Sequence, residues 1–404
     1  MISPIHIADI FVGQSDGSSR IFKDKRVFQL DYVPCRVLHR EEQINRIKLT
    51  LRDLEHGVRA KNILCLGTFG TGKTVVVRSV CRNLSSAPMV AYINCAEGNT
   101  RVKILRESLR QMKDEPVKSG FPSDCYLQWF KDEVARHRYV ILILDEVDKF
   151  VEHKDSEFNE FFYTLSRTVD NVVTIMLTNR ASFETDFLSA LDSRVKDTFY
   201  FERIEFGDYY ANELMDILED RAQTGLNPET YDKGTIAMIA KTAYDQGLRA
   251  RGLIKLARIA GEMAETKAHE RIEEQDVKQA TEQWTRDHDL DIIRRLPPPV
   301  RTILANILVN SPLASAAYEN YRQYALKNGT GESRPQFYLY LKELDTMGLI
   351  DKEKHSYGRG RGANMKLSVR PELKTTVAKS LESEPELLPP HPSVSDSVTE
   401  KTQP

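Results

Sequence analysis

A glycine-rich loop that ends in lysine and threonine follows one apolar run and precedes a helical pattern. The loop reads Gly67-Thr-Phe-Gly-Thr-Gly-Lys-Thr74, after the apolar residues 63–66. Strand, loop and helix in this order form a P-loop: backbone N–H groups surround phosphates, the lysine reaches the β- and γ-phosphates and the hydroxyl ligates Mg²⁺. The sequence therefore predicts bound ATP or ADP with Mg²⁺, the threonine being a metal ligand. The candidate contacts are Gly70, Thr71, Gly72, Lys73, Thr74 and Val75.

Two carboxylates come directly after a second apolar run. Residues 139–144 read as a buried parallel strand, and Asp145 and Glu146 follow it. The carboxyl ends of such strands form the ligand-binding edge of an open α/β sheet. Asp145 suits the outer shell of the magnesium, and Glu146 suits the activation of a water for attack on the γ-phosphate. Two acids after a strand can also cap a helix, but the presence of a P-loop in the same chain makes this alternative less favoured.

The bulk properties fit a globular protein. The 404 residues leave room for two or three domains, and the net charge of −2 means that any basic surface must be local. The five cysteines are scattered without a Cys-x-x-Cys pair, which favours reduced thiols in an intracellular protein. No run approaches the ~20 apolar residues that span a bilayer, and no secretory signal is apparent. We therefore expect a soluble protein without a membrane partner.

Four short segments in a fixed order carry a specific resemblance. They are Phe22-Lys-Asp, Tyr32-Val-Pro, His39-Arg-Glu and the glycine loop. In this order they resemble the archaeal origin-recognition and cell-division-cycle initiators, a branch of the AAA+ ATPases. The resemblance implies an α/β fold, in which an AAA+ P-loop parallel sheet with a helical lid is followed by a winged-helix domain.

The resemblance and the composition together divide the chain. We expect an N-terminal arm at residues 1–20, the AAA+ base at 21–205, the helical lid at 206–290 and the winged helix at 291–371. Residues 372–404 are rich in Glu, Ser, Pro and Thr, which predicts a disordered tail.

The family's adenine-flanking segments are present in this sequence. In that family the Tyr-Val-Pro and His-Arg-Glu segments lie beside the base, which makes Tyr32, Val33, Pro34 and Arg40 candidate contacts. Tyr209, which opens the helical pattern of the lid, is a further candidate for nucleotide binding. Without the resemblance these residues would be only a turn and a helix start.

Two more residues gain a role from the resemblance. The AAA+ core inserts the strand at residues 172–177 between the P-loop strand and the acidic strand, which would let Asn179 orient the attacking water. Arg194 fits the family's arginine finger, which is offered to the nucleotide of a neighbouring protomer. A turn and an ordinary surface arginine are the alternatives.

The lid carries two arginines that compete for one role. The family's signature is Gly-Asp-x-Arg, whereas this sequence has Gly247-Leu-Arg-Ala-Arg-Gly252. Counting back from Arg258 places the γ-phosphate-sensing arginine at Arg251 and leaves Arg249 as a rival. A basic turn at the surface of the lid would explain both.

Two basic segments are candidates for duplex DNA. A helical pattern over about 100–112 lies where the family has an inserted DNA-contacting motif, although a solvated helix face fits as well.

Three helical patterns after residue 299, followed by a glycine- and arginine-rich hairpin, predict a winged helix with Phe337, Leu341 and Leu344 in its core. Its helix would read the major groove while the hairpin reaches phosphates or the minor groove, unless the hairpin is merely a solvated loop. The candidate DNA contacts are Arg101, Lys103, Arg106, Arg110, Arg334, Gln336, Tyr340, Arg359 and Arg361.

The resemblance predicts an ATP-dependent replication initiator that binds double-stranded origin DNA, with slow ATP hydrolysis as a switch for recruiting a replicative helicase. Paralogous initiators are further candidate partners, and the expected location is the cytoplasm of an archaeal cell, at the nucleoid. A winged-helix transcription regulator that binds nucleotide and a remodelling or clamp-loading ATPase are the alternatives. The sequence does not predict the DNA element, the assembly state or whether initiation is activated or repressed.

Overall fold

The computed structural model describes residues 19–56, 58, 60–85, 87–152, 157–167, 169–329, 333–356 and 363–381. The chain divides into two compact units, Met1–Ala280 and Thr281–Pro404. Across the described residues, every helix is too short or too polar to cross a lipid bilayer.

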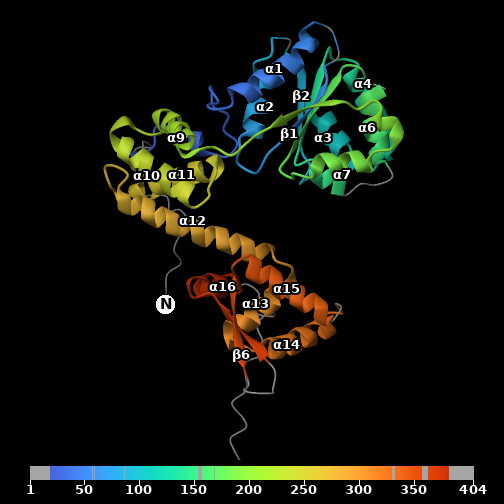
Figure 1. The fold of residues 1–404 in the computed structure, drawn as a ribbon. Coiled ribbons are helices and arrows are strands. Elements are labelled where there is room, and N and C mark those ends of the chain that lie inside the picture. Colours follow the sequence, from blue (N-terminus) through green and yellow to red (C-terminus); the bar gives the residue numbers. More distant parts are fainter. Residues whose placement is uncertain are drawn as a thin grey trace, which may run out of the picture. The chain divides into compact units, whose positions relative to one another are not determined.

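The first unit is built on a five-stranded sheet (Figure 1). Its order is β2-β3-β4-β1-β5, and every neighbouring pair is parallel. The insertion of β4 between β1 and β3 confirms the predicted place of residues 172–177. The bounds are β1 (Asn62–Leu66), β2 (Met89–Asn94), β3 (Val140–Asp145), β4 (Val172–Thr178) and β5 (Phe201–Glu205).

Helices cover both faces of the sheet because alternate strand residues point to opposite sides. Ile63, Cys65, Ile141 and Ile143 pack under α1 (Glu41–Glu55) and α2 (Lys73–Arg82). Leu64, Leu142 and Leu144 pack under the helices of the other layer. Those helices are α3 (Arg101–Lys113), α4 (Ser123–Val134), α5 (Asp148–Glu152), α6 (Phe158–Arg167), α7 (Phe183–Ala190) and α8 (Ser193–Lys196).

The lid consists of α9 (Ala211–Gly225), α10 (Lys233–Asp245) and α11 (Ala250–Thr266), with the short turn η3 (Pro228–Thr230) between the first two. The segment that contains η2 (Lys25–Phe28) packs on α9 and α11. The backbone N–H groups of Lys23 and Asp24 donate to the carbonyl of Gly225 at 2.9 and 3.1 Å. Residues 21–28, which were predicted to begin the base, therefore pack with the lid helices.

The predicted domain boundary at residue 290 falls inside a helix. α12 (Glu274–Arg295) is continuous through this position, so the lid has no break there. In the second unit α13 (Pro298–Asn310), α14 (Ala314–Lys327) and α15 (Arg334–Thr346) precede an antiparallel pair, β6 (Ile350–Ser356) and β7 (Ala363–Val369). This is the element order of a winged helix.

The core of the second unit confirms the predicted stripe on α15. Phe337, Leu341 and Leu344 are all buried. After η4 (Pro371–Leu373), α16 (Lys374–Leu381) packs on α13 and buries Val377. The predicted disorder is wrong for these residues, because an apolar face gives them a place in the core. Residues 382–404 lie outside the described part of the chain.

Candidate functional site

A cavity of about 350 Å³ lies where the P-loop and the ends of β2, β3 and β4 meet α9 and α11. Parallel strands place their carboxyl ends at one edge, so loops far apart in the sequence contribute to one site. The cavity brings together most of the residues predicted to bind or hydrolyse ATP. They are Tyr32, Val33, Pro34, Gly70, Gly72, Lys73, Thr74, Val75, Asp145, Glu146, Asn179, Tyr209 and Arg251.

The P-loop fits closely against the first residues of the lid. Gly72 has φ +89°, and a Cβ atom there would lie 2.7 Å from the hydroxyl of Tyr209. Only glycine satisfies both constraints. The ammonium of Lys73 donates to the carbonyls of Gly67 at 2.6 Å and Thr68 at 2.9 Å. Burial lowers the pKa of Lys73, and the carboxylate of Asp145 acts in the opposite direction.

Thr74 and Asp145 meet at the predicted metal position. The threonine hydroxyl donates to Oδ2 of the carboxylate at 2.7 Å, and the backbone N–H of Glu146 donates to Oδ1 at 3.0 Å. Mg²⁺ prefers hard oxygen ligands and is commonly bound by one or two protein groups together with phosphates and water. A hydroxyl beside a carboxylate at the mouth of a P-loop fits that ion.

Glu146 adopts a backbone conformation that is uncommon for its residue type. Its φ is +52°, in the left-handed region, immediately after the last residue of β3. Such strain is tolerated where the surrounding structure fixes it and is often found at functional sites. Burial raises the pKa of Glu146, and the negative charges of Asp145 and Asp148 raise it further. A carboxylate that binds a proton more readily is better suited to act as a general base.

Asn179 lines the cavity next to the end of β4. Asp145 pairs with Leu177 in the register of β3 and β4, so the carboxylates and the amide come from neighbouring strands at one edge. The buried hydroxyl of Thr178 donates to Asp148 at 2.8 Å. This contact ties the residue before Asn179 to the first residue of α5, the helix that follows β3.

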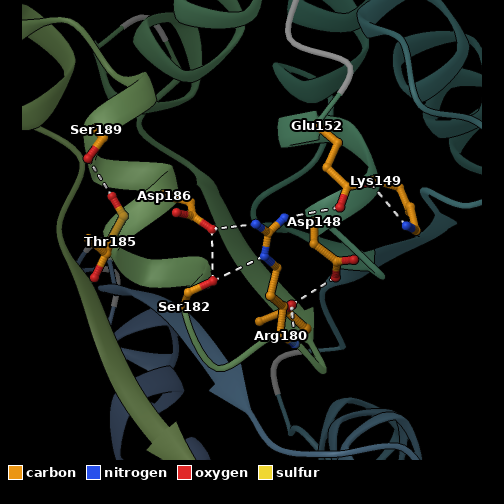
Figure 2. A network of polar contacts seen from close by, with 9 residues as sticks. Asp148, Lys149, Glu152, Arg180, Ser182, Thr185, Asp186 and Ser189 are labelled. Carbon is orange, nitrogen blue, oxygen red and sulfur yellow. Dashed lines mark hydrogen bonds and ion pairs between the residues drawn. The ribbon is translucent and has the colours of Figure 1, made fainter. Parts of the chain in front are cut away.

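Arg180 anchors the chain on the other side of Asn179 (Figure 2). Its guanidinium lies 3.0 Å from Glu152 of α5 and 3.0 Å from Asp186 of α7. The backbone of Asn179 is therefore held from both neighbours. Sequence reasoning missed Arg180, because a single arginine after a strand carries no spacing that reveals its partners.

Arg40 supports the P-loop and does not line the cavity. Its Nε donates to the carbonyl of Thr71 at 3.0 Å, its Nη2 donates to Gly207 at 2.7 Å, and its guanidinium lies 3.6 Å from the ring centroid of Tyr209. These bonds occupy its side chain behind the loop, and the predicted contact of Arg40 with the base stays a prediction. The side chain of Thr71 is also buried and donates to Thr68, so a phosphate would meet only its backbone.

The two lid arginines occupy different surroundings. Arg251 lines the cavity, whereas Arg249 forms a 2.5 Å ion pair with Asp208 in the segment that leads into the lid. The hydrogen bonds from Arg249 and Thr68 lower the pKa of Asp208. The geometry favours Arg251 as the residue that faces the γ-phosphate, and the assignment stays a prediction.

Arg194 is exposed and lies outside the residues that line the cavity. It pairs with Asp192 at 2.8 Å, and its guanidinium lies 5.8 Å from the ring centroid of Tyr163. This position is compatible with a guanidinium that acts on the nucleotide of another molecule. That role stays a prediction.

Arg101 has no exposed surface, which contradicts its predicted place on a basic DNA-contacting face. Its guanidinium contacts three carboxylates, from Asp124 at 3.0 Å, Glu157 at 2.9 Å and Glu160 at 2.5 Å. The prediction is wrong because acidic residues distant in the sequence enclose the side chain. Lys103, Arg106 and Arg110 of the same helix are exposed.

We expect Arg101→Ala to lower the free energy of unfolding by about 3 kcal/mol, because it removes the shared partner of three carboxylates around a buried position. Urea unfolding followed by circular dichroism measures the change. The matched control is Lys103→Ala on the exposed face of α3, for which a change within about 0.5 kcal/mol is expected. Equal stability of the two variants would contradict a structural role for Arg101.

The predicted DNA contacts of the second unit are only partly described. Arg334 is exposed, whereas Gln336 and Tyr340 are half-buried, the latter against Tyr321. Arg359 and Arg361 lie outside the described residues. Two further basic residues of this segment are paired with acids: Lys352 with Asp345 at 3.1 Å and Arg370 with Asp351 at 3.3 Å.

Sequence reasoning missed other cavity residues that carry polar groups. Tyr92 of β2 donates its hydroxyl to Asp145 at 2.8 Å, and Arg78 of α2 lies over its ring. Arg221 of α9 stacks on Tyr32, with its guanidinium 4.6 Å from the ring centroid. One weak signal existed for Tyr92, which carries a polar hydroxyl within an otherwise apolar strand pattern.

Comparisons with known proteins find similarity to AAA+ ATPases in both the base and the lid. Residues 215–282 match a model described as the Cdc6 AAA+ ATPase-type lid domain, and residues 56–185 match an AAA domain. The chain is 30% identical over 388 residues to an ORC1-type DNA replication protein of Methanosarcina acetivorans, with 91% of this chain and 92% of the relative covered. An ORC1-type DNA replication protein of Pyrococcus abyssi is 31% identical, with 87% and 88% covered.

A solved structure is similar along most of the chain. It is described as the Aeropyrum pernix ORC1 protein in complex with DNA. The TM-score is 0.72 at 26% sequence identity, with 91% of this chain and 98% of that chain covered.

Proposed function

This chain belongs to the family of ORC1-type DNA replication proteins, and from that premise we propose that it is an ATP-switched initiator that binds origin DNA. The chain is an AAA+ ATPase. Slow hydrolysis of ATP as a timer and the recruitment of a replicative helicase are parts of the proposal.

One observation carries the ATPase mechanism: the cavity gathers Lys73, Glu146, Asn179 and Arg251 from four separate segments. Lys73 and Arg251 offset negative charge on the phosphates as it develops, and Asn179 orients the attacking water. Glu146 takes the proton of that water as its oxygen attacks the γ-phosphorus, and the bond from that phosphorus to the bridging oxygen breaks, so that ADP leaves with the bonding electrons. Thr74 and Asp145 would hold Mg²⁺, which would supply further positive charge to offset the charge of the phosphates.

Contacts between base and lid support a switch. His39, in the segment before α1, lies 2.9 Å from Asp216 of α9, and Asp208, which pairs with Arg249 of the lid, accepts the hydroxyl of Thr68 in the P-loop at 2.8 Å. ATP in the cavity would touch the P-loop and the lid together, so its binding and hydrolysis would favour different lid positions.

The DNA surface in this proposal has two parts. One is the exposed basic face of α3, formed by Lys103, Arg106 and Arg110. The other is the winged helix, through Arg334 and the arginines of its hairpin. The similarity to a relative whose structure is described as a complex with DNA supports this part of the proposal.

We expect the double variant Arg359→Ala and Arg361→Ala to bind duplex DNA more weakly and with less dependence on salt. Two lost phosphate contacts reduce the slope of log K against log salt by about 2, because each neutralised phosphate contributes about 0.9. Fluorescence anisotropy with a labelled origin duplex at several salt concentrations measures both quantities.

The matched control removes two exposed basic residues from α1, Lys48→Ala with Arg52→Ala. It should keep the wild-type slope. An unchanged slope in the hairpin variant would contradict a role for these arginines and favour a partner other than DNA. ATP binding should be unchanged in both variants.

A genome-wide footprint of the bound protein tests the proposal as a whole. An initiator should occupy sites clustered at replication starts. Occupancy upstream of many genes, without enrichment at replication starts, would instead indicate a transcription regulator.

A further inference from the structure

We propose that Tyr92 is a positioning residue for the Asp145 carboxylate and thereby sets the affinity of the site for the magnesium complex of the nucleotide. This inference rests on the proposed ATP and Mg²⁺ site, and it concerns a residue that does not itself need to touch the nucleotide. It follows from three kinds of contact, which involve the hydroxyl, the ring and the backbone of Tyr92.

The hydroxyl of Tyr92 donates to Oδ2 of Asp145 at 2.8 Å. The same oxygen accepts the hydroxyl of Thr74 at 2.7 Å, while Oδ1 accepts the backbone N–H of Glu146 at 3.0 Å. Three donors therefore fix the plane of one carboxylate. Without the tyrosine hydroxyl, Oδ2 keeps a single side-chain donor, the hydroxyl of Thr74, and the orientation of the carboxylate is less restricted.

The ring of Tyr92 is held from α2. The guanidinium carbon of Arg78 lies 3.9 Å from the ring centroid, within the range of a cation–π interaction. Arg78 lies four residues after Thr74, one helical turn away on the same face of α2. The helix that carries the metal-binding hydroxyl thus also holds the tyrosine ring.

The backbone of Tyr92 is held from α3. Its N–H donates to Oε1 of Gln111 at 2.8 Å, and its carbonyl accepts Nε2 of Gln111 at 2.7 Å. β2 is an edge strand, so these two groups face away from β3 and find their partners in this side-chain amide. Glu107 accepts a further hydrogen bond from Nε2 at 2.7 Å and fixes the orientation of the amide.

These contacts give Tyr92 little freedom, because strand, ring and hydroxyl are each fixed by a different element. A donor held in this way can keep a carboxylate in one orientation. Groups that hydrogen-bond to metal-site ligands commonly change metal affinity 10- to 100-fold when they are removed. The contribution of Tyr92 should therefore depend on Mg²⁺, whereas the contacts of the P-loop backbone with phosphates should not.

Tyr92→Phe tests the inference, because it removes the hydroxyl and keeps the ring over which Arg78 lies. A fluorescent ATP analogue is bound to the full chain with EDTA, and again during titration with MgCl₂. We expect affinity in EDTA to stay within about twofold of wild type, while the half-saturating Mg²⁺ concentration rises about tenfold. Tyr244→Phe, an exposed tyrosine of α10, is the matched control and should match wild type.

A half-saturating Mg²⁺ concentration within about twofold of wild type would overturn the inference and leave the proposed function standing. An equal loss of affinity in EDTA and in Mg²⁺ would also overturn it, since that pattern indicates general damage to the fold. A wild-type protein that binds the analogue equally well with and without Mg²⁺ would contradict the metal site itself.

Gln111→Ala provides an independent test, since it leaves the hydroxyl in place and releases the backbone of Tyr92. We expect a smaller shift of the Mg²⁺ titration in the same direction, with a melting temperature that shows a folded protein. A shift in the opposite direction would contradict the idea that the position of the tyrosine matters.

Discussion

Glu146→Gln should leave ATP binding intact and slow ATP turnover about 10³-fold. Glutamine keeps the size of the side chain and one acceptor oxygen but cannot accept the proton of the attacking water. A positioned general base commonly contributes between about 10² and 10⁴ in rate, and this carboxylate lies in the cavity beside Asn179. Single-turnover release of phosphate measures the rate, and equilibrium binding of labelled ATP measures the affinity.

The control for this experiment is Glu97→Gln, an exposed carboxylate in the loop after β2. It should turn over ATP at the wild-type rate. A Glu146→Gln variant that retains more than about a tenth of the wild-type rate would show that another group activates the water. A loss of ATP binding in this variant would instead indicate that the left-handed backbone at residue 146 needs the glutamate itself.

The parts of the site that follow from local sequence were predicted from the residues. A short stretch of sequence is enough to identify the P-loop from Gly67 to Thr74 and the acidic end of β3. A glycine loop and a buried parallel strand each have a short, specific pattern. The order of the strands in the sheet could not be predicted from local sequence. Nothing between residues 172 and 178 indicates that β4 inserts between β1 and β3, and only the family resemblance supplied this order, which the structure confirms.

Contacts between residues far apart in the sequence explain why the surroundings of Arg101 and Arg40 were not predicted. Arg101 has the spacing of a basic helix face, but it is enclosed by Asp124, Glu157 and Glu160, whose side chains approach it only after α4 and α6 have packed. Arg40 follows the family's adenine-flanking motif, yet its hydrogen-bond partners lie on the P-loop and on the way into the lid. In each case the sequence shows which residue types are present, but it does not show how close they lie to one another in the folded protein.

Residues 21–28 show that contacts distant in the sequence also decide which domain a segment packs with. Residues 21–28 precede the base in sequence, and they were assigned to it. Their side chains instead fit around Gly225, where a Cβ atom would lie 2.5 Å from the ring of Phe28. The glycine and the phenylalanine are about 200 residues apart, so no local pattern links them.

Arg251→Ala should slow ATP hydrolysis about 10²-fold, whereas Arg249→Ala should change the rate by less than about threefold. A guanidinium directed at developing phosphate charge stabilises the transition state more than the ground state. Arg251 lines the cavity. Burial raises the pKa of Glu146, and the positive charge of Arg251 is one of the groups that act against that rise, which is consistent with their closeness.

Arg249 is the matched control because it has the same side chain two residues away and a different partner. It pairs with Asp208, which also accepts the hydroxyl of Thr68 at 2.8 Å. Its loss should loosen the link between lid and P-loop and weaken ATP affinity more than it lowers the rate at saturating ATP. Measuring rate and affinity separately for both variants distinguishes the two roles. A larger rate loss in Arg249→Ala than in Arg251→Ala would reverse the assignment, since only the arginine that meets the γ-phosphate stabilises the charge that develops there.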